Sequence, residues 1–358
     1  MHARIAGLGQ WFPEGIRKNA DWPEEFGQAM RKRQGDRTLV DVPTDGEPDL
    51  HRAIVRRCLA AEQNDPFLGG QERRIAEPGF SSSQAEANAA QAALDDAKVA
   101  AGDVDAILSW ALVPDRLMPS NACRVAHLLG AKRAWASTVD AACASPVTQL
   151  TLAASLIESG RARNVLLTQS HLVSPTFPMM HPASPCVGDG ATAMLVTASE
   201  EPGILLTHSV THGEHYDAVV WCRDKDPEKD APWWEPGGAY FMGSHNQEAT
   251  RQLMQDTVKV GATTVQELAE RARFDVSTIE VLVSVQPRRW VPGAIAEGLG
   301  LSERVTVNTY EKYAHLGGAG AVANLLAARE VGLLKRGALA VMYAQGAGFT
   351  RAAAAIRW

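Results

Sequence analysis

The chain has 358 residues, of which 46% are hydrophobic, so it can bury either two ordinary domains or one large layered α/β unit. Its net charge of -6 excludes general nucleic-acid binding, because neutralising phosphates requires a concentrated basic surface. No apolar run is long enough for a membrane-spanning helix, and the N-terminus lacks the basic-then-apolar order of a secretion signal, so we expect a cytoplasmic protein with no membrane association.

In the first half of the chain, apolar runs alternate with helix-start signals. An Ala-rich stretch with Ser at its start and a later segment entered through Pro and Ser are both typical of helices. The predicted elements, in chain order, are a strand at 3–13, helices at 49–62 and 82–99, a strand at 104–113, a helix at 119–131, a strand at 134–142, a helix at 145–160 and strands at 162–173 and 188–199.

The second half repeats this order of elements. After a Trp- and Pro-rich segment come one or two helices at 246–272, a strand at 279–287, a helix at 291–301, a strand at 305–310, a helix at 318–334 and a closing strand pair at 337–358. Two halves of β-α-β-α-β-β type imply two similar sheets packed against shared helices. We place the halves at 1–203 and 204–358, with a divergent insertion at about 17–75.

The five cysteines are odd in number and include no C-x-x-C pair, so we expect free thiols and no zinc site. Cys143, in "VDAACASP", follows a strand-like run and precedes a helix that opens near Ser145. A lone cysteine there is either a small core residue or a nucleophile. If it sits at the helix entrance, unpaired N–H groups and the helix dipole would stabilise its thiolate.

Four stretches resemble the thiolase superfamily, and most closely its ketoacyl-ACP synthase III branch: 119–131, 137–171, 187–196 and 315–358. The resemblance covers roughly 75–358. It implies an α/β thiolase-like fold, a five-layer αβαβα sandwich built from the two halves. It also implies a homodimer, a covalent thioester on Cys143 and no permanently bound cofactor.

In that branch a His and an Asn assist the cysteine. The His position falls here at Gln286, or at Val285 if the register slips by one, and the Asn position falls at His315. Gln cannot exchange a proton at neutral pH, whereas His315 can. The pairing resembles that of true thiolases, but the second cysteine those enzymes need is absent from "YAQGAGF".

The resemblance with these departures predicts an acyltransferase. Cys143 would take an acyl group from an acyl carrier protein (acyl-ACP) or from acyl-CoA and pass it, with His315 as base, to a small non-standard acceptor in specialised, polyketide-type metabolism. Backbone N–H groups of Cys143 and of the loop from Gly346 to Gly348 are the expected oxyanion donors. A Claisen-type condensing enzyme and a non-catalytic partner subunit of a ketosynthase heteromer remain as alternatives.

Further residues fall near the acyl pocket or the carrier in this resemblance, and each also has an ordinary alternative. Met118 is either a pocket rim shared across the dimer or plain interface packing, and His181 is either a second base or a pocket-wall or turn histidine. Trp234 lies in the Trp-rich segment 221–243, which is either a lid or a loop packed on its own tryptophans. Residues placed near pantetheine or its phosphate are Asn246, Arg288 and Arg289.

Overall fold

The structure, a computed structural model, describes residues 1–35, 49–238 and 240–358 and is built around two sheets. The first sheet has the order β1 (His2–Trp11), β7 (Gly190–Ser199), β6 (Asn164–His171), β4 (Ala106–Ala111) and β5 (Trp135–Thr138). The second has the order β11 (Val281–Ser284), β12 (Leu339–Gly346), β13 (Thr350–Arg357) and β8 (Ile204–Thr211). β4, β5 and β6 run parallel, so their carboxyl ends meet at one edge of the first sheet.

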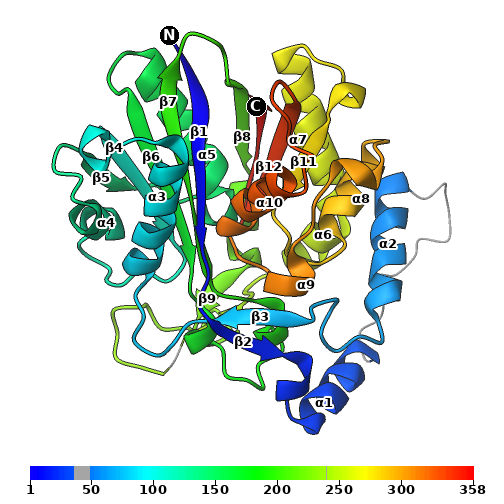
Figure 1. The fold of residues 1–358 in the computed structure, drawn as a ribbon. Coiled ribbons are helices and arrows are strands. Elements are labelled where there is room, and N and C mark those ends of the chain that lie inside the picture. Colours follow the sequence, from blue (N-terminus) through cyan, green and yellow to red (C-terminus); the bar gives the residue numbers. More distant parts are fainter. Residues whose placement is uncertain (36–48, 239) are drawn as a thin grey trace.

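Helices cover both sheets and fill the space between them (Figure 1). α3 (Ser82–Ala97) and α4 (Asn121–Leu129) pack on the first sheet alone, and α7 (Thr257–Ala272) and α8 (Val291–Gly298) pack on the second alone. α5 (Ser145–Glu158) and α10 (Ala319–Glu330) contact strands of both sheets. This order of layers confirms the predicted five-layer sandwich. No helix of the described ranges has the length and apolar character needed to cross a bilayer.

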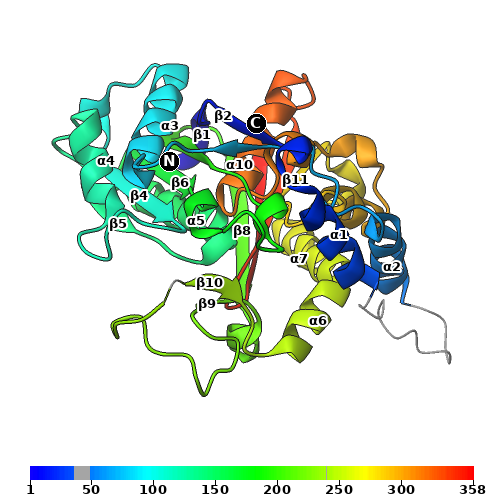
Figure 2. The same cartoon turned by 90° about the horizontal axis from the view of Figure 1, so that it is seen from below.

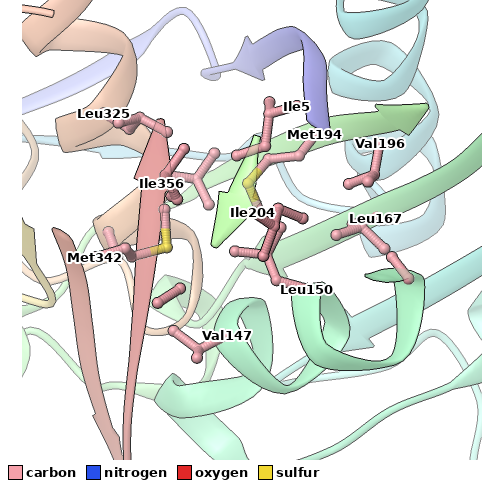
Figure 3. Close-up of a cluster of buried hydrophobic side chains, with 14 of the residues drawn as sticks. Ile5, Val147, Leu150, Leu167, Met194, Val196, Ile204, Leu325, Met342 and Ile356 are labelled. Atoms are coloured by element: carbon pink, nitrogen blue, oxygen red, sulfur yellow. The ribbon is translucent and has the colours of Figure 1, made fainter. Parts of the chain in front are cut away.

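The main core lies between the two sheets, around the central helices. Figure 3 shows Val147 and Leu150 of α5 directed into a cluster that includes Met194 of β7 and Met342 of β12. All four side chains are fully buried. Because α5 begins two residues after Cys143, this core fixes the helix that directly follows the turn carrying the predicted nucleophile.

The N-terminal region adds a separate layer at one end of the molecule, next to the antiparallel pair β2 (Gly15–Lys18) and β3 (Glu72–Ile75) (Figures 1 and 2). α1 (Glu24–Gly35) lies at this end, whereas α2 (Leu50–Glu62) packs against α7 and α8. The insertion predicted at about 17–75 therefore contains regular structure, and its residues 36–48 lie outside the described residues. β7 ends at Ser199 and β8 begins in the other sheet, while the boundary at 203/204 stays a prediction.

One predicted strand, at 305–310, is wrong. The chain forms a 3-10 turn over Glu303–Val305 and the short helix α9 (Tyr310–Tyr313), and only an isolated bridge joins Thr306 to Leu282. Local side-chain bonds favour the turn, since the Thr306 hydroxyl donates to the Glu303 carbonyl at 2.9 Å. The sequence analysis also missed β8 and α1. The remaining elements are β9 (Val220–Cys222), β10 (Phe241–Gly243) and α6 (Gln247–Gln255).

An ion-pair network on the outer side of the second sheet gives a pH-dependent contribution to stability. Arg351 donates to both oxygens of Glu267, at 2.6 and 3.2 Å, and His208 lies 2.8 Å from the same carboxylate. The bonds from Arg351, followed by that from His208, outweigh the effect of burial and lower the pKa of Glu267 to about 2. Ionised Glu267 therefore stabilises the fold fully above its unfolded-state pKa of about 4.5.

We expect Glu267→Gln to lower the free energy of unfolding by about 1–2 kcal/mol near neutral pH, a value reduced for solvent screening because the carboxylate is one-third exposed. The loss should shrink as the pH falls through the window from about 4.5 to about 2, because the wild-type carboxylate then becomes protonated. Urea denaturation of both proteins at several pH values measures the difference. A difference that stays constant down to pH 3 would contradict this assignment.

Candidate active site

Cys143 lies in a tight turn between β5 and α5. The 3-10 turn Ala142–Ala144 leads directly into α5, with Ala142 in the left-handed region at φ +48°. That conformation is disfavoured for alanine and costs about 1–3 kcal/mol, so the surrounding bonds must hold it. Asp140 accepts from the Ala142 N–H at 2.8 Å, and the Ser145 hydroxyl donates to the Ala142 carbonyl at 2.7 Å. The turn therefore presents Cys143 in a fixed position.

His315 reaches the same place from the other half of the chain. Ala314, the residue before it, has the unusual backbone angles φ +55° and ψ -152°. A loop of the first half pairs with the backbone of His315, whose N–H donates to the Cys186 carbonyl at 2.9 Å and whose carbonyl accepts from Gly188 at 3.1 Å. The structure thus brings together the two predicted catalytic residues, with 3.6 Å between Cys143 Sγ and His315 Nε2.

Both members of this pair are neutral at rest. Burial, with a smaller contribution from Asp140, raises the pKa of the Cys143 thiol to about 12. Burial, and then the neighbouring His171, lowers the pKa of His315 to about 3. The expected stabilisation of a thiolate by the α5 dipole is therefore outweighed by the loss of solvation. The geometry instead suits a base that accepts the thiol proton as the sulfur attacks.

Gly346 is in close contact with the nucleophile turn. A Cβ atom on Gly346 would lie 2.0 Å from the Ala141 carbonyl oxygen and 3.0 Å from the Ala144 nitrogen, so only glycine fits there. Gly348 has φ +113° and faces open space. The end of β12 thus lies against the turn that carries Cys143, and the oxyanion role of these glycines stays a prediction.

Gln286 lies behind the histidine and does not extend toward the sulfur. Its side-chain amide donates to the Thr309 hydroxyl at 2.9 Å and to the Ala314 carbonyl at 3.2 Å, and its side-chain oxygen accepts from Asn324 at 2.9 Å. The side chain is fully buried. Because these bonds use both groups of the amide, the carbonyl that Gln286 orients is the peptide carbonyl preceding His315. This placement favours a positioning role.

We expect Gln286→Ala to slow acylation of Cys143 about tenfold, because the Ala314 peptide and the attached His315 lose a fixed partner. The buried groups left unpaired should also cost about 1–3 kcal/mol of stability. Stopped-flow acylation with an activated ester measures the rate, and Gln286→Met, which keeps the volume without the hydrogen bonds, is the matched control. If Gln286→Met acylates at the wild-type rate, the hydrogen bonds do not position His315.

Two comparisons by sequence identify the family. The family model described as 3-Oxoacyl-[acyl-carrier-protein (ACP)] synthase III matches residues 138–213, and the model of its C-terminal part matches residues 269–358. The β-ketoacyl-[acyl-carrier-protein] synthase III of Pectobacterium atrosepticum is 30% identical over 359 residues and covers 100% of both chains. The chain belongs to this family. It is thus one of the acyl-transferring and condensing enzymes of the thiolase superfamily.

Solved structures agree with this assignment to the ketoacyl synthase III family. The 3-oxoacyl-[acyl-carrier-protein] synthase III of Aquifex aeolicus is 26% identical with a TM-score of 0.77, and the match covers 99% of this chain and 100% of that one. The priming β-ketosynthase of the R1128 polyketide pathway has the same TM-score of 0.77 at 22% identity, covering 99% of this chain and 96% of that one. At that identity the second match shows the fold alone.

The residues predicted near the carrier have partners within the protein. Asn246 caps α6, its side chain accepting from the Ala249 N–H at 3.0 Å. Arg288 lies 3.5 Å from Glu62, and Arg289 pairs with Glu311 at 2.5 Å. A phosphate at either arginine would have to compete with these carboxylates.

The predicted pocket and lid residues make their contacts away from Cys143 and His315. Met118 is 84% exposed on the loop before α4, and Trp234 is 68% exposed and packs edge-on against Trp233. His181 accepts from the Ala183 N–H at 3.1 Å, and its ring packs against Phe177. These contacts are those of a turn histidine. A different histidine ring lies next to His315.

That ring belongs to His171, which the sequence analysis did not single out. His171 is the last residue of β6, and Cys143 follows β5 in the same sheet. Because β4, β5 and β6 are parallel, residues at their carboxyl ends lie near one another. A histidine near the end of a predicted strand of this sheet could therefore have been identified from the sequence as a residue close to Cys143.

Asp189 braces the loop that holds His315. Its carboxylate accepts from the backbone of Ala76, Val173 and Ser174 at 2.8 to 3.0 Å, and from the Ser174 hydroxyl at 2.5 Å. A cavity of about 470 Å³ lies beside it, lined by Arg17, Glu77 and Ser174 among others. Neither Cys143 nor His315 lines that cavity.

Proposed function

We propose that this ketoacyl synthase III homologue is a thioester-dependent acyltransferase that carries its acyl group on Cys143. The observation that carries the proposal is the 3.6 Å separation of the thiol and the His315 ring, with no second proton-transfer group at the position of Gln286. One imidazole is sufficient for thioester exchange, since the same proton is taken up and returned in each half of the reaction.

In the loading step, His315 Nε2 takes the proton of the Cys143 thiol as Sγ attacks the carbonyl carbon of an acyl-CoA or acyl-ACP. The C–S bond to the donor breaks, and His315 gives the proton to the departing thiolate. In the second step an acceptor O–H, N–H or acidic C–H gives its proton to His315 and attacks the thioester, and the proton returns to Cys143. Backbone N–H groups of Cys143 and of the loop from Gly346 to Gly348 would hold the oxyanion.

Claisen condensation is the second candidate, favoured by the names of the relatives, which are β-ketoacyl-[acyl-carrier-protein] synthases III. Condensation after decarboxylation requires donors that stabilise an enolate. Here Gln286 uses its amide N–H groups within the protein, so His315 would have to serve alone. A non-catalytic partner subunit is less consistent with the site, because such a subunit needs no thiol and imidazole in contact.

We also propose the partners of the enzyme and its metabolic setting. An acyl carrier protein or coenzyme A would deliver the thioester, a small molecule would accept the acyl group, and the enzyme would act as a cytoplasmic homodimer in polyketide-type metabolism. Met118 and the adjacent Leu117, both strongly exposed, supply apolar surface for a dimer contact. As a lid, the segment 221–243 would have to move for its exposed Trp234 to reach an acceptor at Cys143.

Supplying the purified protein with an acyl-CoA series together with malonyl-CoA, and separately with alcohols and amines, tests the choice between the two reactions. We expect acyl esters or amides, and no carbon dioxide released from malonyl-CoA. Release of carbon dioxide with a 3-oxoacyl product would instead establish condensation and overturn the transferase proposal.

A further inference from the structure

A buried tryptophan contacts both of the loops that carry Cys143 and His315. Trp110 is 1% exposed and belongs to β4, the strand that lies between β5, which leads to Cys143, and β6. We propose that Trp110 is a positioning residue that sets the distance between the thiol and the imidazole, because it holds the turn of the first and supports the loop of the second. This inference rests on the proposed function, in which the two groups exchange a proton.

The indole N–H of Trp110 reaches the turn that carries Cys143 through a carboxylate. It donates to Asp140 Oδ1 at 2.9 Å, and the same oxygen accepts from the Ala142 N–H at 2.8 Å. Ala142 has φ +48°, a conformation that an alanine keeps only when its surroundings enforce it. Because one oxygen joins the two donors, the indole fixes where Asp140 holds the residue that precedes Cys143.

The indole ring packs against the loop that follows His315. Gly318 has ordinary helical angles, φ -62° and ψ -26°, yet a Cβ there would lie 2.9 Å from Trp110 Cε3 and 3.0 Å from Trp110 Cζ3. A Cβ on Gly317, where φ is +54°, would lie 3.0 Å from Trp110 Cη2. The backbone of both glycines therefore lies directly on the ring, and the size of the indole determines how closely this loop approaches the turn of Cys143.

The loop after His315 is packed from a second side as well. A Cβ on Gly318 would lie 3.4 Å from Pro146 Cδ, in the first turn of α5. Proline has no N–H to donate, so Pro146 supplies contact alone, whereas Trp110 supplies contact and a hydrogen bond. The loop is thus held between the indole and the helix that follows the nucleophile.

The separation of the catalytic pair matters because proton transfer depends steeply on distance. Cys143 Sγ and His315 Nε2 lie 3.6 Å apart, and a displacement of about 1 Å in an active site can cost about 10²-fold in rate. A side chain that couples the two loops therefore acts on the rate of acylation, although it touches neither the sulfur nor the acyl group.

The test is the rate of acylation of Cys143 by an activated ester, measured by stopped flow over a range of ester concentrations. Trp110→Phe keeps an aromatic ring against the loop and removes the N–H that bonds to Asp140. We expect the limiting rate to fall about tenfold while the ester concentration at half-maximal rate stays unchanged, because only the step after binding depends on the pair. Trp135→Phe, at a tryptophan 48% exposed on β5, is the control and should match the wild type.

A double-mutant cycle shows whether the effect passes through the carboxylate. Added to Asp140→Ala, Trp110→Phe should slow acylation by less than about twofold, because the N–H then has no acceptor to lose. Circular dichroism establishes that the variants are folded. Full additivity of the two losses, or a wild-type limiting rate in folded Trp110→Phe, would overturn the proposal.

Gly318→Ala tests the packing contact and decides the matter if the tryptophan variants do not fold. Its helical φ suits alanine, so its effect arises from the methyl group against the indole. We expect a loss of about tenfold in the limiting rate, and a wild-type rate would contradict the proposal.

Alkylation of Cys143 by iodoacetamide requires no acyl donor and should rank the variants in the same order; a different order would also overturn the proposal. If the acyl group forms on Cys143 with this ranking but reaches no alcohol or amine, the proposed function is rejected and this inference stands.

Discussion

His315→Ala should slow the acylation of Cys143 by about 10²–10⁴-fold, the range typical for loss of a general base. The structure gives the reason: the thiol has a pKa raised to about 12, so almost none of it is thiolate near neutral pH, and His315 Nε2 at 3.6 Å is the group in contact that can take its proton. Single-turnover loading from an acyl thioester, followed by intact-mass analysis, measures the effect.

The ranking of His315→Ala against Gln286→Ala tests which residue is the base. Gln286 acts on His315 through the Ala314 carbonyl, so its loss should cost less than the loss of the ring itself. Free imidazole added to His315→Ala should restore part of the rate, because the removed ring leaves space beside the sulfur. The reverse ranking of the two variants would mean that the base is assigned to the wrong residue.

Among the substitutions proposed for this protein, Glu86→Ala should cause the largest loss of stability, lowering the free energy of unfolding by about 3–5 kcal/mol. Glu86 of α3 is fully buried, and four side chains donate to its carboxylate. They are Ser109 at 2.5 Å, Thr168 at 2.6 Å, and Asn121 and Ser170 at 3.0 Å each. Burial raises the pKa of Glu86 in spite of these donors. Truncation leaves all four groups without their acceptor and opens a cavity in the first sheet's outer layer.

Glu86→Gln is the matched control, because it keeps the volume and one oxygen acceptor. The hydroxyls of Ser109 and Thr168 can turn to accept from the new amide, so the loss should fall to about 1 kcal/mol. Urea denaturation compares the three proteins. Equal losses for Ala and Gln would mean that the charge of the carboxylate, and not its set of acceptors, supports the fold.

Much of the fold was predictable because local signals and packing agree. The helix expected at 49–62 is α2, with Asp49 accepting from His51 at its N-terminus, and the helix expected at 145–160 is α5, entered through Pro146. The misses have local causes. β8 is a half-buried strand at the edge of its sheet, and its polar His208 and Ser209 interrupt the apolar pattern. The β-branched residues near 305 predict a strand, but side-chain bonds to nearby backbone turn the chain.

For the site, the sequence indicated residue types but not their surroundings. Cys143 and His315 were predicted together, and the structure places them in contact. The expected stabilisation of a Cys143 thiolate was wrong, because the dipole of a helix is visible in a sequence whereas desolvation by the rest of the fold is not. Gln286 and His171 depend on partners far away in the chain, Asn324 and Gly188, which only the folded structure brings to them.

The most direct test of the account is the intact mass of the purified protein after incubation with a panel of acyl-CoA and acyl-ACP thioesters, followed by mapping of the modified peptide. A single acyl adduct should form on Cys143 and be absent from Cys143→Ala. If no thioester of the panel acylates the protein, or if Cys143→Ala acquires the same adduct, the proposed covalent enzyme is contradicted.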